Sequence, residues 1–386
     1  MRQSYRVVLL VPTAREFERG LRRGVVEYAH AHGPWVLLEE APDYLQTLTP
    51  RQRLRDILGW QADGMIVLQS RLDEVNSLRL PMIVIGTQEP SPPRYQLVCG
   101  DEEIGRLGAT TLLELGMRHF AYCGLRGLCF SELRGAAFQQ AVEQAGYAAF
   151  VFSSSAPRPG HSWYAEQKLL ARWLSSLPKP AGLMACNDDR ARMLAEICRL
   201  QGIHVPDDIA ILGVDNDEQV CRSANPPLSS IALATERAGY EAAALLASVM
   251  SGRTPAAGTV TVLPTRVVPR QSTDILALED EHVVRAIRFI RENSNRNLRV
   301  SDLVPVAGLS RRALQDAFVK NLGRTPMEEI QIRRAERIAR MLVETNMSIG
   351  MIAEAAGFEV SAHLARFFSR RTGLTPHAYR KKYRNS

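Results

Sequence analysis

The amino-acid sequence predicts two kinds of fold in one chain: an α/β core of two lobes built on parallel sheets, then an all-α domain with two helix-turn-helix units. Three observations support this prediction. Short apolar runs alternate with amphipathic helical patterns over about the first 270 residues. A helix, a glycine turn and a basic helix occur twice in the last hundred or so residues. The excess positive charge falls on that second part.

The first part alternates buried strand patterns with helical patterns. Strands that are apolar on both faces and separated by helices are typical of parallel sheets. There are too many strands for one small sheet, so we expect two similar lobes. The expected strands cover 6–11, 35–38, 65–68, 82–85, 97–99, 120–123, 149–152, 182–185 and 209–214, and the expected helices cover 16–31, 51–58, 102–115, 132–144, 164–176, 190–200 and 236–250.

The first helix-turn-helix pattern spans residues 301–323. A short helix is expected to close at Gly308, and Ser310 is expected to cap the next helix. Leu314 and Phe318 then fall four residues apart on the buried side of that helix. A long helix follows through about residue 344, with a start typical of helices: Thr325 as cap, Pro326 at the first helical position and Glu328 closing a capping box.

The second pattern runs from Ser348 to Arg380. Its first helix has apolar residues at i, i+3, i+4 and i+7, starting at Ile349. Gly357 ends it, and Ser361 is expected to cap a second helix with Leu364 facing the core. A helix–turn–helix with a basic second helix is how many proteins place side chains in the major groove of DNA. Two such patterns joined by a long helix make that interpretation specific.

Charge supports the same division of the chain. Residues 275–386 contain 20 Lys and Arg against 12 Asp and Glu, a net charge of +8. The preceding residues contain 28 basic and 29 acidic side chains, a net charge of −1. Positive charge confined to the helical part is expected where that part meets phosphates, whereas a solvated basic face without function is the plainer alternative.

Domain boundaries follow from these patterns. The two-lobed domain is expected to cover 1–270, with lobe 1 at about 4–116 and 235–258, and lobe 2 at about 117–232 and 260–270. Residues 271–280 are expected to form a linker after the run PTRVVPRQSTD. The helical domain then covers 281–386, with its two units at about 300–321 and 348–372.

Several classes of protein are disfavoured. The six cysteines have no C-x-x-C spacing and the eight histidines are scattered, so we expect neither a metal site nor a cofactor. The cysteines fit the core of a reduced cytoplasmic protein. The apolar run at the N-terminus is too short for a secretory signal, and no run approaches the roughly 20 residues of a membrane span. We therefore expect a cytoplasmic protein.

The loops after the strands carry side chains suited to hydroxyl groups. Carboxylates, amides and guanidinium groups supply acceptors and donors in fixed directions, and an aromatic ring can cover the C–H face of a sugar. No glycine-rich phosphate loop is present. The candidate ligand-binding residues are Phe17, Glu18, Arg19, Asp101, Arg134, Asn187, Asp188 and Asp215. The alternative for Asp101, Asp188 and Asp215 is that each caps the helix after its strand.

The helical part resembles the AraC family of transcription regulators over roughly residues 280–384. The resemblance rests on IAEAAGF at 352–358, Phe368, Gly373, Thr375-Pro376 and Tyr379-Arg380. It implies about seven helices that set two recognition helices in successive major grooves. For contacts to bases and phosphates we favour Arg311, Arg312, Gln315, Lys320, Ser361, Ala362, Ala365, Arg366, Arg370 and Arg371. Arg380 is a further candidate for a phosphate. The arginines of the connecting helix are expected to be solvated or phosphate-facing: Arg333, Arg334, Arg337 and Arg340.

The first part resembles the sugar-binding core of the LacI/GalR regulators, itself similar to periplasmic binding proteins. This resemblance covers roughly residues 4–270 and rests on GVVEYAHAHG, DGMIVL, LRGAAF, CND and IAILGVDND. It implies that Arg134, Asp188 and Asp215 contact a ligand held between the lobes. It also implies that the chain crosses between lobes near 116–118, 231–235 and 260–265.

The two halves together resemble regulators of pentose operons. That resemblance implies D-xylose or a related pentose as effector and activation of transcription as output. We expect a homodimer that binds operator DNA, with RNA polymerase as a partner if it activates. The effector would close the lobes and change the dimer geometry. Repression and a different sugar or polyol remain alternatives. A cytosolic sugar-metabolising enzyme and a transport binding protein are less favoured, because no catalytic motif and no signal peptide are found.

Overall fold

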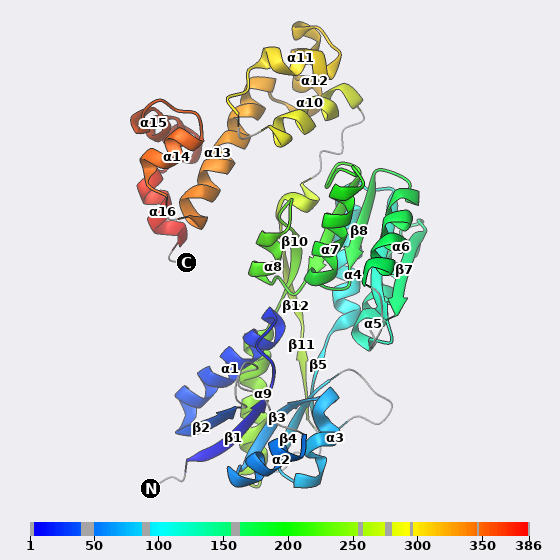
Figure 1. The fold of residues 1–386 in the computed structure, drawn as a ribbon, viewed down its shortest axis with the longest axis vertical. Coiled ribbons are helices and arrows are strands. Elements are labelled where there is room, and N and C mark those ends of the chain that lie inside the picture. The colour runs from blue at the N-terminus through cyan, green and yellow to red at the C-terminus, as the bar shows by residue number, and fades with distance from the viewer. Residues whose placement is uncertain are drawn as a thin grey trace. The chain divides into compact units, whose positions relative to one another are not determined.

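The computed structural model describes residues 4–39, 50–86, 93–155, 163–253, 258–274, 280–293, 296–345 and 347–384. The chain divides into two compact units, Met1–Ile275 and Leu276–Ser386. The division falls inside the predicted linker, of which residues 275–279 lie outside the described residues. The fold class is as predicted, with two α/β lobes in the first unit and helices in the second (Figure 1).

The first lobe is built on a six-stranded parallel sheet in the order β11-β5-β4-β3-β1-β2. The four inner strands of this sheet are mostly buried, which accounts for their continuous apolar sequence, whereas the two edge strands are partly exposed. The strands are β1 (Tyr5–Leu10), β2 (Trp35–Glu39), β3 (Gly64–Leu68), β4 (Met82–Ile85), β5 (Tyr95–Cys99) and β11 (Gly258–Val262). The helices of this lobe are α1 (Glu16–His32), α2 (Pro50–Gly59), the single turn α3 (Leu72–Val75) and α9 (Thr235–Met250).

The second lobe has a six-stranded sheet in the order β12-β10-β9-β8-β6-β7, parallel except for the β10–β12 pair. The strands are β6 (His119–Arg126), β7 (Ala149–Ser155), β8 (Ala181–Ala185), β9 (Ile209–Val214), β10 (Ser229–Leu233) and β12 (Pro264–Val268). Its helices are α4 (Asp101–Glu114), α5 (Cys129–Gln144), α6 (Trp163–Ser176), α7 (Asp188–Leu200) and α8 (Glu218–Ser223). The sequence patterns did not predict α3 or α8, which are both short, and β10, β11 and β12 were expected only as crossings near 231–235 and 260–265.

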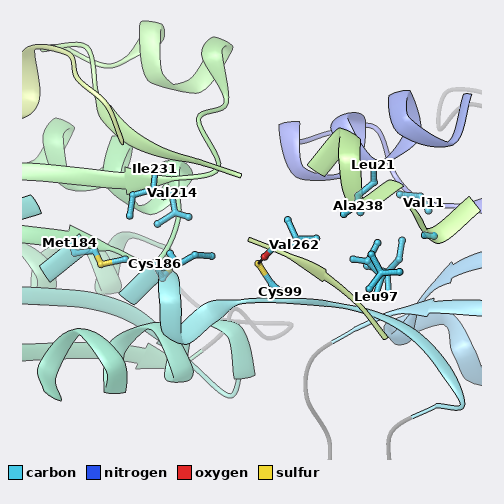
Figure 2. Close-up of a cluster of buried hydrophobic side chains, with 14 of the residues drawn as sticks. Val11, Leu21, Leu97, Cys99, Met184, Cys186, Val214, Ile231, Ala238 and Val262 are labelled. Carbon is cyan, nitrogen blue, oxygen red and sulfur yellow. Dashed lines mark hydrogen bonds between the residues drawn. The ribbon is translucent and has the colours of Figure 1, made fainter. Parts of the chain in front are cut away.

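The chain crosses between the lobes three times, at Gly100, Ala234 and Leu263. The first crossing corrects the expectation of 116–118, because α4 packs on α5 and β8 and therefore belongs to the second lobe (Figure 1). The predicted lobe boundary also placed residues 260–262 in the second lobe, whereas β11 pairs with β5 in the first. Figure 2 shows Cys99 and Val262 side by side at these crossings, where the Gly100 N–H donates to the Val262 carbonyl at 2.9 Å.

Helices α1 and α9 approach each other closely through glycines (Figure 1). A Cβ atom on Gly24 would lie 1.9 Å from the Glu236 carbonyl oxygen of α9. A Cβ atom on Gly239 would lie 2.0 Å from the Leu21 carbonyl oxygen of α1. Because both obstacles are backbone atoms, neither helix can accept a side chain here without moving apart from the other.

The described residues of the second unit form seven helices, as the resemblance implies. They are α10 (Glu281–Glu292), α11 (Val300–Ala307), α12 (Arg311–Leu322), α13 (Pro326–Glu344), α14 (Ile349–Ala355), α15 (Ser361–Thr372) and α16 (Pro376–Arg384). These helices form two apolar cores. The first includes Leu314 and Phe318 with α10 and α11, and the second includes Leu364 and Phe368 with α14.

The predicted helix ends of this unit are largely confirmed. Ser310 caps α12 through the Ala313 N–H, Thr325 and Glu328 form a capping box, and Gly308 adopts a left-handed conformation at φ 68°. The prediction that Ser361 caps α15 is wrong: Val360 occupies the cap position without a side-chain bond, and Ser361 is the first helical residue.

The structure bears on the expectations for membrane-spanning segments and for the cysteines. No helix in the described ranges is both long and apolar enough to cross a bilayer. All six cysteines are free thiols, five of them buried and Cys129 half-buried.

Replacing Gly24 with alanine is expected to destabilise the first unit. Alanine favours a helix by about 1 kcal/mol over glycine, but here its methyl group would meet the α9 backbone. Overpacking of this kind costs about 1–3 kcal/mol, so urea unfolding should shift to lower concentration. Gly59→Ala is the matched control, because a Cβ atom at this helical position meets nothing within 4 Å. Equal or higher stability of Gly24→Ala would contradict the close packing of α1 on α9.

Candidate functional site

The predicted ligand-binding residues gather where the two lobes meet in the first unit. They follow strand ends: Glu18 and Arg19 lie on α1 after β1, Asp101 follows β5, and Asp188 and Asp215 follow β8 and β9. The carboxyl ends of parallel strands are where open α/β sheets bind ligands. The structure therefore brings side chains far apart in sequence to one region, as the two-lobed prediction requires.

Arg134 of α5 is a buried cation in this region. Its Nε donates to Asp101 Oδ1 at 2.8 Å and its Nη1 to the Cys186 carbonyl at 2.6 Å, and Asp215 Oδ1 lies 4.0 Å from Nη1. Burial opposes its charge, but Asp215 and Asp101 outweigh burial, so the pKa of Arg134 is raised. The guanidinium also lies over the Phe130 ring. Arg134 thus holds two of the predicted acidic residues in place.

Asp188 has a different position from the one predicted for a ligand contact. It is 2% exposed, and its carboxylate accepts from Ser230 Oγ at 2.6 Å and from the Asp217 N–H at 2.7 Å. The Cys221 thiol also lies 3.3 Å from it. These contacts give Asp188 the role of fixing the loop after β9. Burial raises the pKa of Asp188 to about 7, although the Ser230 and Asp217 hydrogen bonds act to lower it.

Asp217, which the sequence analysis did not select, joins the two lobes. Its Oδ1 accepts from the Gln219 and Val220 N–H groups and so caps α8. Its Oδ2 accepts from Arg19 Nη2 at 2.8 Å and from the Glu16 N–H at 3.0 Å, both on α1 of the other lobe. The sequence offers two acidic residues in Asp215-Asn216-Asp217, and because aspartates have the same preference for a cap position, the pattern does not show which of them caps α8.

A second link between the lobes pairs Arg15 with Asp189 at the start of α7. The expected capping alternatives are also resolved here. Helix α4 is capped by Gly100 and α7 by Asn187, whose side chain accepts from the Arg190 N–H at 2.9 Å. Asp101 and Asp188 are therefore first helical residues and not caps, and Asp215 precedes the cap of α8.

Burial raises the pKa of both Glu18 and Asp215, and one oxygen of Glu18 has no hydrogen-bond partner among the described atoms. The Glu18 Oε2 atom is buried and makes no hydrogen bond to the described atoms. Burial raises the pKa of Glu18, opposed by the charges of Arg15 and Arg19. Burial also raises the pKa of Asp215 well above its ordinary value, opposed by Arg134. Phe17, the predicted aromatic cover, is half-buried against the apolar core.

The side chains of this region supply acceptors and donors in fixed directions. Ligand hydroxyls can donate to carboxylates such as Glu18 and Asp215 and accept from guanidinium groups such as Arg19. In the described part of the chain, no group of three or more His, Cys, Asp and Glu residues is placed to hold a metal ion.

The predicted nucleic-acid contacts lie on the exposed sides of α12 and α15. Arg311, Arg312, Gln315 and Lys320 are exposed on α12, and Ser361, Ala362, Arg366, Arg370 and Arg371 on α15, with Ala365 half-buried. A hollow of about 520 Å³ beside α15 is lined by Gln331, His363, Arg366, Phe367, Arg370 and Arg371. His363 is an addition to the predicted set, and its signal was its place on the exposed side of α15.

Three arginines predicted to be solvated or phosphate-facing are engaged within the protein. Arg333 pairs with the buried Glu329 at 2.8 Å. Arg334 donates to the Ala356 and Gly357 carbonyls. Arg380 donates to the Leu342 carbonyl through Nε at 2.9 Å and to the Met347 carbonyl through Nη2 at 2.6 Å. Arg334 and Arg380 bind carbonyls at helix ends and Arg333 forms an ion pair within α13, so the expectation for these three side chains is corrected.

Comparison with known proteins agrees with this architecture. Residues 109–273 match a family described as a periplasmic binding protein-like domain, and residues 303–382 match a helix-turn-helix domain. The chain is a helix-turn-helix transcription regulator. The regulator is 28% identical to the xylose operon regulatory protein of Escherichia coli strain K12, covering 98% of this chain and 97% of that protein.

Two further similarities cover the whole chain. The xylose operon regulatory protein of Haemophilus influenzae is 26% identical to the regulator over 98% of each chain. A solved structure described as the xylose-binding transcription activator xylR superposes with a TM-score of 0.82 at 26% identity, covering 99% of each chain. The similarity to these proteins therefore extends over both units of the chain.

The raised pKa of Asp188 predicts the pH dependence of stability. A carboxyl group with a folded pKa of about 7 binds its proton more tightly in the folded state than in the unfolded state. Its contribution is therefore fully present below the unfolded pKa of about 4 and is lost as pH rises through about 7. The melting temperature of the first unit's transition should fall between pH 5.5 and pH 8.

Asp188→Asn separates this carboxyl group from the other acidic residues of the region. The variant should melt lower overall, because an amide cannot accept all the donors that surround Asp188. Its decline from pH 5.5 to pH 8 should be shallower than that of the parent protein. An unchanged slope would assign the titration to other groups.

Proposed function

We propose that the regulator senses a small polyhydroxylated molecule between its lobes, with D-xylose or a related pentose as effector. The observation that carries this proposal is the Glu18 Oε2 atom, which is buried and makes no hydrogen bond to the described atoms, on a side chain close to Asp215 and to the arginines of the lobe contact. Buried acceptors without donors are costly, and ligand hydroxyls supply those donors. End-to-end similarity to xylose operon regulatory proteins favours the pentose.

The proposed mechanism is a shift between two arrangements of the lobes. Arg19 and Asp217 belong to opposite lobes, so a ligand that bridges the same region stabilises one lobe arrangement over another. In a homodimer this shift changes the placement of the DNA-reading units on two operator half-sites. We further propose that the protein acts in the cytoplasm as an activator, with RNA polymerase as its partner on the promoter.

The decisive experiment is a thermal-shift panel of pentoses, hexoses and polyols with the full-length protein. D-xylose should raise the melting temperature in a concentration-dependent way, with calorimetry giving the affinity. Stabilisation by a different sugar alone would replace xylose while leaving the sensor role intact. No stabilisation by any member would contradict a polyhydroxylated effector, and turnover of the sugar would favour an enzyme.

Glu18→Gln is expected to weaken D-xylose binding by about 10–100-fold, because a hydrogen bond to a charged group contributes about 1.5–3 kcal/mol. The substitution keeps the shape of the side chain and removes its negative charge. Glu27→Gln is the matched control, since Glu27 is exposed on the same helix. Calorimetric titration of both variants distinguishes a ligand contact from a general loss of acidity. Equal affinities of parent and Glu18→Gln would remove Glu18 from the site.

Arg366→Ala is expected to cost about 1–3 kcal/mol of operator affinity and to relax one base position, if the guanidinium pairs with guanine. Arg366 is exposed on α15. Arg237→Ala is a control of equal charge change on the first unit, where Arg237 pairs with Glu241. In-vitro selection of DNA by parent and variant measures both effects. A uniform loss over all sequences would make Arg366 a phosphate contact.

A further inference from the structure

The second unit has two DNA-reading halves, the first formed by α10–α12 and the second by α14–α16, and each half has its own apolar core. Helix α13 contributes Ile330 to the first core, and Ile338 and Leu342 to the second. The angle between α12 and α15 therefore depends on how α13 is held against each half. A helix alone fixes distance along its axis, but the rotation of each half about that axis needs side-chain contacts.

Arg334 lies on α13 between its contributions to the two cores and makes such contacts. Its Nε and Nη2 donate to the Ala356 carbonyl at 3.0 and 2.6 Å, and Nη2 also donates to the Gly357 carbonyl at 3.0 Å. These carbonyls lie at the end of α14, in the turn between α14 and α15. Carbonyls at a helix end lack intrahelical donors, and a cation there is favourable.

The same guanidinium also contacts Phe358, which packs against α15, and Asn297, which lies before α11. Its carbon lies 3.8 Å from the centre of the Phe358 ring, and Phe358 packs on Phe367 of α15. Its Nη1 donates to Asn297 Oδ1 at 3.3 Å, and Asn297 precedes α11 in the first half. One planar group thus contacts the turn that sets α15 and a loop that belongs to the other DNA-reading half.

We propose that Arg334 is a positioning residue that fixes the orientation of α15 relative to α12, so that both recognition helices bind their DNA elements in register. This inference rests on the proposed DNA recognition by the two halves of the second unit. Lysine cannot replace the arginine here, because one ammonium group lacks the planar fork that reaches two carbonyls and an amide while stacking on a ring. Arg334 itself contacts no base in this proposal.

The test uses the full-length protein and a DNA fragment selected in vitro for binding the parent, which contains both elements. A second fragment has the element bound by α12 scrambled and keeps the element bound by α15, and a third has two base pairs inserted between the elements. Arg334→Lys should bind the two-element fragment at least tenfold more weakly and the one-element fragment within twofold of the parent. The insertion should weaken the parent strongly and the variant much less.

Asn297→Ala provides a second variant in which the clamp on the α14 carbonyls stays intact. It should show a smaller loss of the same kind, about threefold on the two-element fragment, with one-element binding unchanged. Equal losses on both fragments would indicate local damage and overturn the proposal. Retained two-element binding and spacing dependence in both variants would also overturn it. Failure of the parent to select any DNA would overturn the proposed DNA recognition, and this inference with it.

Discussion

The sensor half depends on one buried carboxylate that both lobes share. Asp217 is 2% exposed, caps α8 with one oxygen and accepts from α1 of the other lobe with the second oxygen. Its own N–H is held by Asp188, which Ser230 also fixes. An oxygen of a buried carboxylate is costly to leave without a donor, so Arg19 and the Glu16 N–H stabilise the Asp217 carboxylate while the lobes are in contact. The contact between the lobes therefore also stabilises the loop after β9.

The second unit uses guanidinium groups in a similar way, but against backbone carbonyls. Arg334 holds the end of α14 and Arg380 joins the end of α13 to the start of α14. Arginines in this basic unit thus fall into two sets, one exposed on α12 and α15 and one engaged with helix ends. The net charge of the unit counts both sets, so only part of its positive charge is available for phosphates.

Sequence patterns predicted most of the parallel strands, the two lobes and the caps of α12 and α13, because each depends on local periodicity or on one capping residue. They misplaced the first crossing between lobes. The apolar stripe of α4 looks the same whichever lobe it packs against, so only its contacts with α5 and β8 decide. The capping alternative for Asp215 missed by two residues: Asp217 and not Asp215 caps α8, since neighbouring acidic residues have the same capping preference.

The chemistry of the lobe contact also fits the proposed effect of a neutral ligand on the regulator. Glu18 and Asp215 have raised pKa values because burial disfavours their charge. In the proposed site, new donors stabilise both carboxylates, and ligand hydroxyls provide donors without adding charge. Donors that reach carboxylates of both lobes at once must favour the arrangement in which those lobes are close. A ligand that contacted one lobe alone would bind both arrangements equally and shift neither.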